Sequence, residues 1–494
     1  MRLAELIVAV EAEIVRGDPD VAIADLAYES QRVGSGTLFF CVRGMTADGH
    51  DFAPGAVERG AAALVVEREL DLAVPQVKVP DARAAMGPLA VRFWGDPTAE
   101  LKVAGITGTN GKTTTAFLLR RILEAEDHQT GLLGTVKRVV GGREEDVIRT
   151  TPEAIDLQAT FRRMLERGDE ACVMEVSSHA LALGRSEGIS YDVRAFTNLT
   201  QDHLDFHSDM EDYFAAKRRL FEHEAADASS WGTAVVNADD GYGQRLIDQL
   251  RDQATELLTF SGRGEDADFR AEDVEFDAGS TRFRCRAPDG EARVEMPLPG
   301  HFNVENALAA LACASALGVG IGAGAAALRR APRVPGRFEP VDEGQPFAVL
   351  VDYAHTPDSL ENVLHAARRV TEGRVICVFG CGGDRDREKR PLMGAIAAER
   401  SDLCVVTSDN PRSEDPEAII ADILAGVPGP DAVEIEPNRR AAIALALGEP
   451  SAGDTVVIAG KGHEQGQEFE NGKKIPFDDR AVATEELRRL MATA

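Results

Sequence analysis

The segment 105-GITGTNGKTTT-115 constrains the fold more than any other part of this chain. An apolar run from Leu101 to Ile106 precedes it and predicts a strand, and apolar residues at helical spacing from Ala116 to Leu123 follow it. A strand, a glycine-rich turn and a helix in this order surround nucleotide phosphates with backbone N–H groups and a helix N-terminus. The sequence therefore predicts a loop that binds the phosphates of a nucleoside triphosphate.

Two side chains of this loop have chemistry that suits a triphosphate. Lys112 can reach the terminal phosphates, and the hydroxyl of Thr113 can ligate Mg²⁺. The loop is a variant of the pattern G-x-x-x-x-G-K-[ST], because the first glycine of the pattern falls on Ile106. The alternative is a chance glycine turn before an ordinary helix.

Composition limits the partners of the chain. A length of 494 residues indicates two to four domains, and a net charge of −29 argues against nucleic acid or an anionic membrane as a partner. The 7 cysteines are odd in number and include no CxxC pair, which favours reduced thiols in a cytoplasmic protein. The N-terminal segment MRLAELIVAVEAEIVRG is charged throughout and predicts a short amphipathic helix, not a signal peptide.

One uncharged stretch, Ala307 to Leu328, is as long as a membrane span. Glycines interrupt it, so a buried helix, a turn and a second short helix fit better. Before it, residues 265–297 alternate apolar and charged residues, which predicts an antiparallel ribbon.

Polar side chains follow several predicted strands of the central region. The strand in 171-ACVMEVSSHA-180 ends at Glu175 and Ser177, and the strand that starts at Val193 leads to His203. Ligands gather at the carboxyl ends of parallel strands, so we expect Glu175 and His203 to meet Lys112 and Thr113 and to supply Mg²⁺ ligands. Each of these residues taken alone has a structural alternative.

Other polar residues leave two interpretations open from pattern alone. Thr150 and Thr151 precede a helical pattern and either cap it or face a ligand; Asn303 and Asn306 have the same two alternatives. Lys217 lies in an amphipathic helical segment and has the pattern of a surface lysine. Ser30 lies in a polar turn, 28-YESQRVGSG-36, and is either solvated or in contact with a ligand.

A further α/β region follows residue 337, with predicted strands Ala348–Val351, Val375–Phe379, Leu403–Val406 and Val456–Ile458. A polar cluster follows each strand, which predicts a second binding surface rich in Arg and Asp. Arg385 and Arg412 suit a carboxylate, and Asp409 and Glu464 suit an ammonium group. The alternative is a set of surface ion pairs of little energetic weight.

The motifs GITGTNGKTTT, TTPEA, MEVSSHA, NLTQDHLDFH, YFAAK, GHFNVENALAA, RVPGRFE, VDYAHTPDSLE, FGCGGDRDREKRPLMG, SDNPRSEDP and AGKGHEQGQ extend along the whole chain. In this set the chain resembles the Mur ligase family. The resemblance implies an α/β fold of three domains: a small N-terminal α/β domain (1–98) that binds the UDP substrate, a central P-loop ATPase-like parallel sheet (99–337) that binds ATP, and a C-terminal Rossmann-like α/β domain (338–494) that binds the amino acid.

The resemblance also implies roles for individual residues. ATP would contact Gly108, Thr109, Asn110, Gly111, Lys112, Thr113, Thr114, Asn303, Asn306, Arg337, Asp352 and His355. The UDP-linked substrate would contact Ser30, Thr150, Thr151, Ser177 and Arg185, and the amino acid would contact Arg385, Asp409, Asn410, Pro411, Arg412, Gly460 and Glu464. Thr113, Glu175, His203 and a carbamylated Lys217 would hold Mg²⁺. Leu183 departs from relatives that have Gln at this position.

The DNPR sequence at 409–412 is similar to family members that add meso-diaminopimelate to UDP-MurNAc-L-Ala-D-Glu in peptidoglycan precursor synthesis. That resemblance implies an ATP-dependent ligase that is cytoplasmic and monomeric, without nucleic-acid partners or membrane insertion. The same reaction with L-lysine is the closest alternative. A folylpolyglutamate-type ligase and an ATPase that performs no ligation are two further alternatives.

Overall fold

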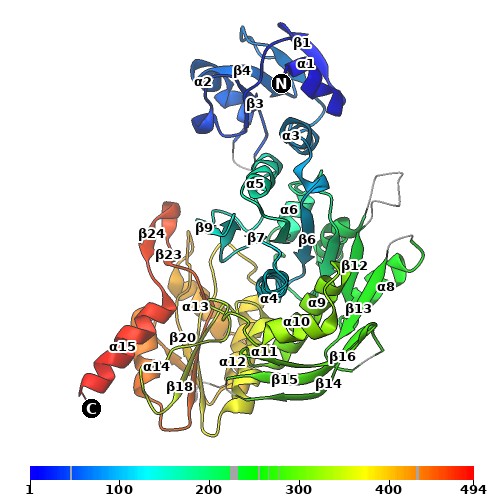
Figure 1. Ribbon diagram of the computed structural model, residues 1–494. Helices are drawn as coiled ribbons and strands as arrows, with labels where there is room; N and C mark the ends of the chain where they lie inside the picture. The colour runs from blue at the N-terminus through cyan, green and yellow to red at the C-terminus, as the bar shows by residue number, and fades with distance from the viewer. Residues whose placement is uncertain are drawn as a thin grey trace. The chain divides into compact units, whose positions relative to one another are not determined.

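Figure 1 shows the computed structural model, which describes residues 1–44, 47–222, 232–253, 256–264, 266–277, 279–429 and 433–493. The chain forms two compact units. The first unit comprises Met1–Gly105, Asp127–Arg194 and Arg219–Gly232, and the second comprises Ile106–Glu126, Ala195–Arg218 and Thr233–Ala494. Strands β6 (Lys102–Thr107) and β11 (Val193–Phe196) carry the chain from one unit to the other.

The first unit begins with a five-stranded sheet in the order β1-β5-β4-β3-β2. Its strands are β1 (Glu13–Arg16), β2 (Asp25–Ala27), β3 (Thr37–Phe40), β4 (Ala61–Val66) and β5 (Gln76–Lys78). Leu38 and Phe40 pack with helices α1 (Leu3–Leu6) and α3 (Met86–Trp94), whereas Phe39 packs with α2 (Ala53–Glu58). This alternation along β3 buries both faces of the sheet.

The predicted N-terminal amphipathic helix is only partly correct. Helix α1 and a 3₁₀ turn, Ile7–Ala9, account for the first part of the segment, but residues from Glu13 onward form β1. Strand β1 pairs antiparallel with β5, with Glu13 opposite Lys78. The pairing with a strand more than 60 residues away overrides the local helical pattern.

The remainder of the first unit contains β10 (Ala171–Glu175), which is parallel to β7 (Thr130–Leu133). Strands β8 (Arg138–Val140) and β9 (Arg143–Glu145) extend this part antiparallel, and helices α5 (Ala154–Glu166) and α6 (Ser178–Ala182) accompany it. The N-cap of α5 is Glu153, and no side chain caps this helix. The interpretation of Thr150 and Thr151 as helix caps is therefore wrong.

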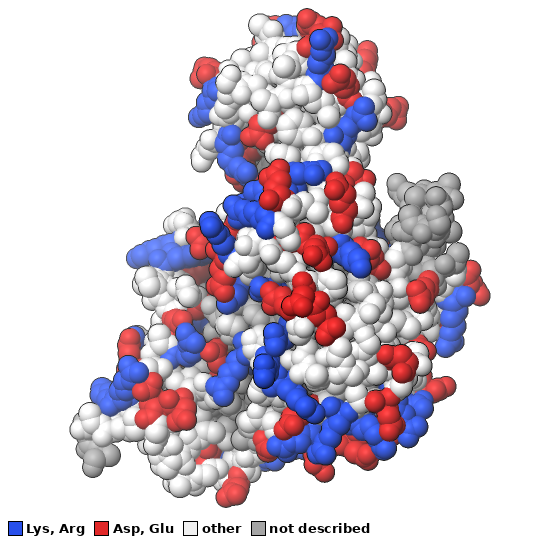
Figure 2. Space-filling model, in the orientation of Figure 1, with Lys and Arg blue, Asp and Glu red and all other residues white. Residues whose placement is uncertain are grey.

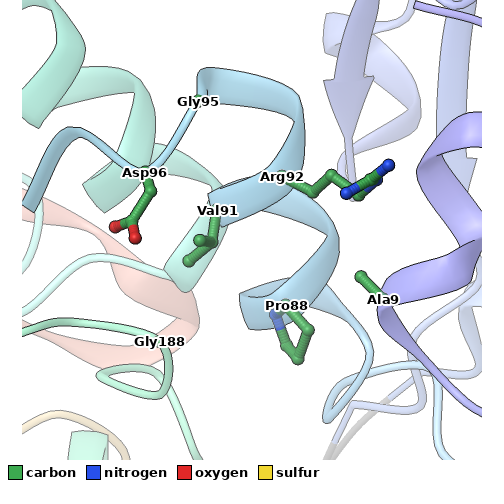
Figure 3. Close-up of a pocket in the computed structure, with 7 residues that line it drawn as sticks. All are labelled: Ala9, Pro88, Val91, Arg92, Gly95, Asp96 and Gly188. Atoms are coloured by element: carbon green, nitrogen blue, oxygen red, sulfur yellow. The ribbon is translucent and has the colours of Figure 1, made fainter. Parts of the chain in front are cut away.

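A cavity of about 510 Å³ in the first unit lies beside α3 (Figure 3). Pro88, Val91 and Arg92 line it from α3, and Gly188 lines it from the segment after α6. No residue of the predicted sites lines this cavity.

In the second unit, α4 (Lys112–Ala125) follows the phosphate loop, and α9 (His301–Ala316) and α10 (Ile321–Leu328) pack close to it. This pair of helices confirms the helix-turn-helix prediction for the uncharged stretch. Within the described ranges, no helix has the length and apolar content that a membrane crossing requires.

Strands β12 (Thr233–Asn237), β13 (Leu257–Ser261) and β14 (Phe269–Phe276) pair in parallel, and β14 continues antiparallel into β15 (Thr281–Ala287) and β16 (Gly290–Met296). The predicted antiparallel ribbon is confirmed, although positions 265 and 278 of that stretch lie outside the described residues. Helices α7 (Met210–Arg218) and α8 (Gly241–Leu250) complete this part.

The C-terminal part is a six-stranded sheet in the order β17-β18-β22-β19-β20-β21. Its strands are β17 (Glu339–Pro340), β18 (Ala348–Asp352), β19 (Val375–Phe379), β20 (Leu403–Val406), β21 (Val433–Ile435) and β22 (Thr455–Ala459). All neighbours except β17 and β18 are parallel, which confirms the predicted parallel sheet. A small antiparallel pair, β23 (Gly466–Glu468) and β24 (Lys474–Pro476), follows β22.

Both faces of this sheet are covered by helices. Helices α11 (Pro357–Val370), α12 (Lys389–Arg400) and α13 (Pro416–Leu424) pack on the face that contains Cys377 and Phe379. Helices α14 (Arg439–Gly448) and α15 (Asp479–Thr493) pack on the opposite face, which contains Ile376 and Val378. The carboxyl ends of β18, β19, β20 and β22 lie at one edge and position the motifs that follow them. Acidic and basic side chains are interspersed over the visible surface (Figure 2).

Candidate active site

The phosphate loop has the predicted strand-turn-helix form, from β6 to α4. Gly108 has φ +148° and Gly111 has φ +88°, values that favour glycine. A Cβ atom on Gly108 would lie 1.9 Å from the Thr197 hydroxyl oxygen. The backbone of the loop can therefore approach its neighbours only because these residues are glycines.

The segment after β11 supports the loop from behind. The backbone N–H of Thr109 donates to the Asn198 carbonyl at 2.9 Å, and that of Asn110 donates to the Asn198 side-chain oxygen at 2.8 Å. The Asn198 amide and the Thr197 hydroxyl both donate to the carbonyl of Asn110, at 3.2 and 2.6 Å. These bonds hold the loop in a defined conformation without using Lys112 or Thr113.

Two lysines converge on one carbonyl of the loop. Lys112 Nζ and Lys217 Nζ donate to the Gly108 carbonyl at 2.7 and 2.8 Å, and Lys112 also donates to the Thr109 carbonyl at 2.8 Å. Lys217 is 1% exposed, so its interpretation as a surface lysine is wrong. Burial and the neighbouring charge of Lys112 hold the pKa of Lys217 well below its usual range.

The two asparagines of α9 lie against the loop and the start of α4. The Thr115 hydroxyl donates to Asn306 Oδ1 at 3.4 Å, and the Asn306 amide donates to Asn303 Oδ1 at 3.1 Å. The Asn303 amide in turn donates to the Pro299 carbonyl at 2.7 Å, and the N-cap of α9 is Gly300. Neither asparagine is the N-cap, and Asn306 lies at the loop.

Two residues of the C-terminal part, Arg337 before β17 and Asp358 in α11, also reach the loop. Arg337 Nη2 donates to the Thr113 hydroxyl at 3.3 Å, and the Asn110 amide donates to Asp358 at 2.8 Å. Asp352, at the end of β18, accepts from the backbone N–H groups of Phe338 and Ala354 at 2.6 and 2.8 Å and so fixes the segment that carries Arg337.

Asp202 connects the central segment with the C-terminal sheet. Its buried carboxylate lies 3.3 Å from His203 Nε2, 3.6 Å from His355 Nε2 and 3.5 Å from Lys389 Nζ. Burial pushes the pKa of Asp202 up, but the charges of His203, Lys389 and His355 outweigh it and hold the pKa well below its usual range. His355 Nδ1 lies 2.7 Å from the Tyr353 carbonyl, to which it donates, so Nε2 faces Asp202.

The predicted amino-acid site is built at the ends of β20 and β22. The Asn410 amide donates to Glu464 Oε2 at 2.8 Å, and the buried Lys461 donates to Asn410 Oδ1 at 2.8 Å and to Glu464 Oε2 at 3.0 Å. Asp409 Oδ2 is buried and has no hydrogen-bond partner among the described residues. Gly460 has φ +117°, and a Cβ atom there would lie 2.8 Å from that oxygen.

The two arginines of this site differ in how firmly they are held. Arg412 has φ +53°, its Nη1 donates to the Gly383 carbonyl at 2.7 Å, and its Nε lies 3.3 Å from Glu468 Oε2. The Pro411 carbonyl packs against Gly383, where a Cβ atom would lie 1.9 Å from it. Arg385 is half exposed and lies 3.5 Å from Asp205. Arg412 is therefore fixed, while Arg385 projects from the loop after β19.

In the first unit, Thr135 links two predicted residues, the metal ligand Glu175 and the substrate residue Thr150. Its backbone N–H and hydroxyl donate to Glu175 at 2.8 and 3.1 Å, and its hydroxyl lies 3.0 Å from that of Thr150. The Thr151 hydroxyl donates to the Glu175 carbonyl at 2.9 Å and accepts from the backbone N–H of Ser177 at 3.1 Å. Thr150, Thr151, Glu175 and Ser177 therefore form one polar cluster.

Two further predicted residues lie near the start of α5. Arg185 Nε lies 3.0 Å from Oε1 of Glu153, which follows Thr151 by two residues in sequence. Ser30 begins a short 3₁₀ turn, Ser30–Arg32, and the Arg32 guanidinium donates to Asp156 of α5 at 2.7 Å. The structure thus connects the turn of Ser30 to the helix that follows Thr150 and Thr151.

The predicted Mg²⁺ ligands are divided between the units: Glu175 belongs to the first, and Thr113, His203 and Lys217 belong to the second. Within the described ranges, no three His, Cys, Asp or Glu side chains are grouped to hold a metal ion. The Thr113 hydroxyl, at the first turn of α4, and the buried Glu175 carboxylate are oxygen donors of the kind that Mg²⁺ prefers. The complete ligand set remains a prediction.

Family models cover most of the chain. The model described as "Mur ligase family, catalytic domain" matches residues 22–94, "Mur ligase middle domain" matches 106–314, and "Mur ligase, glutamate ligase domain" matches 336–462. The chain belongs to the Mur ligase family. The predicted α/β fold of three domains is thereby confirmed for this Mur ligase, and so is its assignment to the ATP-dependent ligases.

Curated relatives similar to this Mur ligase over nearly its whole length include proteins named UDP-N-acetylmuramoyl-L-alanyl-D-glutamate–2,6-diaminopimelate ligase. The protein of that name from Geobacillus kaustophilus is 49% identical over 94% of this chain and 95% of its own length. The one from Syntrophomonas wolfei is 46% identical over 99% of both chains. A solved structure with this name is 31% identical, has a TM-score of 0.70 and covers 99% of both chains.

Several residues of this Mur ligase site escaped prediction from the sequence. Asp202, Lys389, Lys461 and Glu153 lie inside recognised motifs but were assigned no role, and Thr135 gave no signal that could be separated from its surroundings. Each of these residues contacts either a residue distant in sequence or a near neighbour, and in both cases only the folded structure shows the contact. A search for charged residues inside the motifs would have found Asp202, Lys389, Lys461 and Glu153.

Proposed function

We propose that this Mur ligase joins meso-diaminopimelate to UDP-MurNAc-L-Ala-D-Glu with the hydrolysis of ATP, in peptidoglycan precursor synthesis. The names of the relatives at 46–49% identity support this reaction. The observation in the chain itself that carries the choice of amino acid is the fixed Arg412 guanidinium. Its partner Glu468 donates its backbone N–H to Asn410 Oδ1 at 3.0 Å, which ties Arg412 to the network of Asn410, Lys461 and Glu464. We also propose that the protein is located in the cytoplasm and is a monomer.

The proposed domains are the UDP-substrate domain at 1–98, the ATP domain at 99–337 and the amino-acid domain at 338–494. The edges of the three family matches, which fall at 94, 106, 314 and 336, support boundaries in these places. In the proposed assignment, Ser30, Thr150, Thr151, Ser177 and Arg185 contact the UDP-linked dipeptide. The cluster of Thr150, Thr151 and Ser177 around Glu175 supports it.

In the proposed ATP site, residues Gly108 to Thr114 surround the phosphates. Lys112 leaves the loop carbonyls to which it now donates and bonds the β- and γ-phosphates instead. Asn303 and Asn306 lie toward the adenine, and Arg337, Asp352 and His355 meet the nucleotide from the C-terminal domain. The 3.3 Å bond between Arg337 and Thr113 supports that approach.

We propose Thr113, Glu175, His203 and a carbamylated Lys217 as the residues that hold Mg²⁺. When bound, Mg²⁺ would neutralise charge on the transferring phosphoryl group. Complete burial and the neighbouring Lys112 favour a neutral Lys217 amine, the form that reacts with CO₂ to give a carbamate and a proton. The carbamate would supply the anionic oxygens that the uncharged amine lacks.

The reaction follows in two steps. A γ-carboxylate oxygen of D-Glu attacks the γ-phosphorus of ATP, giving an acyl phosphate and ADP, and Lys112 offsets the charge that develops. The amine of diaminopimelate then attacks the acyl carbon, the amide bond forms, the amine loses a proton, and inorganic phosphate leaves. The protein positions both substrates and stabilises charge in each step.

In the proposed amino-acid site, acidic residues bind the ammonium group of the substrate and arginines bind its carboxylates. Asp409 and Glu464 bind an ammonium group. Asp409 Oδ2, which makes no hydrogen bond among the described residues and lies 3.9 Å from Arg439 Nη1, is the oxygen available to it. Arg385 and Arg412 bind carboxylates as bidentate forks. Diaminopimelate has a second carboxylate and L-lysine has none, so a fixed Arg412 favours diaminopimelate.

Phosphate release with ATP, Mg²⁺ and UDP-MurNAc-L-Ala-D-Glu tests the proposal, with meso-diaminopimelate or L-lysine added in parallel. Release that requires diaminopimelate is the expected result. Release with lysine alone would retain the ligase and overturn the specificity. Release indifferent to both amino acids would instead indicate an ATPase that performs no ligation.

A further inference from the structure

The N-terminus of α5 carries an unusual concentration of positive charge around one buried carboxylate. Glu153 Oε2 accepts from Arg83 Nη1 at 2.9 Å, and Glu153 Oε1 accepts from Arg149 Nη1 at 3.1 Å and lies 3.0 Å from Arg185 Nε. All four residues belong to the first unit. We refer to Arg83, Arg149 and Arg185 as the arginine triad.

The triad has more positive charge than Glu153 can balance. Three guanidinium groups face one carboxylate, while the nearby Arg32 is paired with Asp156 at 2.7 Å. The side chain of Glu153 is 4% exposed, whereas those of Arg83 and Arg149 are 24% and 46% exposed. The triad therefore presents unbalanced positive charge to solvent in a chain whose net charge is −29.

The position of the triad connects it with the proposed substrate residues. Glu153 follows Thr151 by two residues, and Thr151 is bonded to Ser177 and to the carbonyl of Glu175. Arg83 comes from the segment before α3, within the proposed UDP-substrate domain, and Arg185 comes from the segment after α6. The triad thus contains residues from the proposed UDP-substrate domain and from the proposed ATP domain, and the UDP-linked dipeptide has to contact both.

We propose that Arg83 and Arg149, together with Arg185, form an oxyanion-binding subsite for the nucleotide-linked dipeptide, and that Glu153 is the positioning residue that orients them. This inference rests on the proposed function. The ligand chemistry is an oxyanion that accepts bidentate guanidinium bonds. The substrate offers two sources of it, the diphosphate and the carboxylates of D-Glu.

The simpler account is that the triad only neutralises Glu153 and stabilises the start of α5. One arginine would satisfy a buried carboxylate, and a second exposed arginine at i−4 would contribute little to stability. The two accounts differ in what the loss of Arg83 and Arg149 changes. A subsite loses affinity for the substrate, whereas a purely structural cluster loses stability and keeps its affinity.

Binding to the full-length protein, measured by calorimetry without ATP or diaminopimelate, separates these accounts. The variants are Arg83→Gln, Arg149→Gln and the double variant. Arg163→Gln is the matched control, because it removes a positive charge from α5 where Arg163 pairs with Glu145 at 2.9 and 3.0 Å. Thermal unfolding of each variant shows whether it folds as the parent does.

Three ligands distinguish the source of the oxyanion: UDP-MurNAc-L-Ala-D-Glu, UDP-MurNAc-L-Ala and MurNAc-L-Ala-D-Glu. We expect the dissociation constant of the complete ligand to rise about tenfold for each guanidinium removed, and to stay within about twofold in Arg163→Gln. An equal loss with UDP-MurNAc-L-Ala assigns the subsite to the diphosphate, and a loss with MurNAc-L-Ala-D-Glu assigns it to a carboxylate.

Unchanged affinity of the double variant for all three ligands would overturn the subsite. Glu153→Gln adds a second criterion: it keeps all three guanidinium groups but weakens their hold on the position-153 side chain, so the subsite account predicts a loss of affinity smaller than that of the double variant. Equal thermal destabilisation in both variants with unaltered affinity would support the structural account. If the parent protein binds none of the three ligands, the proposed function itself fails.

Discussion

Lys461 is the residue whose loss most sharply tests the amino-acid site. Its ammonium is buried and donates to Asn410 Oδ1 at 2.8 Å and to Glu464 Oε2 at 3.0 Å. The same two side chains bond each other at 2.8 Å, so Lys461 holds both of them in one orientation. Substitution of Lys461 by Met preserves most of the side-chain length and apolar contact but removes the charge and both bonds.

The expected effect follows from those two bonds. A hydrogen bond to a charged group contributes about 1.5–3 kcal/mol, and a change of about 1.4 kcal/mol alters affinity tenfold. If Asn410 and Glu464 lose their orientation toward the substrate ammonium, the KM for diaminopimelate should rise about ten- to a hundredfold. The KM for ATP should stay within about twofold, because Lys461 bonds Asn410 and Glu464 in the amino-acid site and not the phosphate loop.

Steady-state phosphate release at varied diaminopimelate and varied ATP measures both constants. Lys474→Met, at an exposed position in β24, is the matched control and should leave both constants unchanged. Thermal unfolding confirms that Lys461→Met remains folded. An unchanged KM for diaminopimelate in a folded Lys461→Met protein would refute the positioning role.

Three further perturbations follow from the geometry. Gly108→Ala places a Cβ atom 1.9 Å from a neighbouring hydroxyl and should abolish ATP binding by calorimetry, whereas Gly241→Ala, with nothing within 4 Å, should not. Burial, with nearby positive groups, lowers the pKa of His463 to about 3, so this residue stays neutral in the folded protein but protonates near pH 6.5 when unfolded. Because only the unfolded state takes up this proton as the pH falls from 7 toward 3, the free energy of unfolding decreases over that range. Between pH 7 and 5, the free energy of unfolding measured with urea should fall about 2 kcal/mol further in the parent than in His463→Gln. Arg439→Met strands the fully buried Asp479, and it should lower the free energy of unfolding by about 3–5 kcal/mol, most of which an added Asp479→Leu should restore.

The parallel core strands were predictable because each signals itself locally. The predicted bounds of β19 and β20 match the observed ones, since both are short runs of buried apolar residues between polar segments. The phosphate loop was predictable for a related reason, because glycine spacing and the following Lys-Thr pair are consecutive in sequence. Local patterns suffice where the structure depends on neighbours in the chain.

Lys217 and β1 show where local patterns fail. The helix that carries Lys217 has the pattern of a surface helix, yet the lysine is buried and donates its hydrogen bond to the Gly108 carbonyl, 109 residues away. The contact of Asp202 with Lys389 spans 187 residues, and the pairing of β1 depends on β5. No pattern within a single segment contains such information, so burial and ion pairing across the fold had to come from the structure.

The account depends centrally on phosphorylation of the D-Glu carboxylate by ATP. That step is tested by labelling the γ-carboxylate oxygens of UDP-MurNAc-L-Ala-D-Glu with ¹⁸O and determining the mass of the phosphate released during turnover with meso-diaminopimelate. Transfer through an acyl phosphate predicts one ¹⁸O atom in each phosphate formed. Unlabelled phosphate would show that water attacks ATP directly, and would contradict the proposed mechanism.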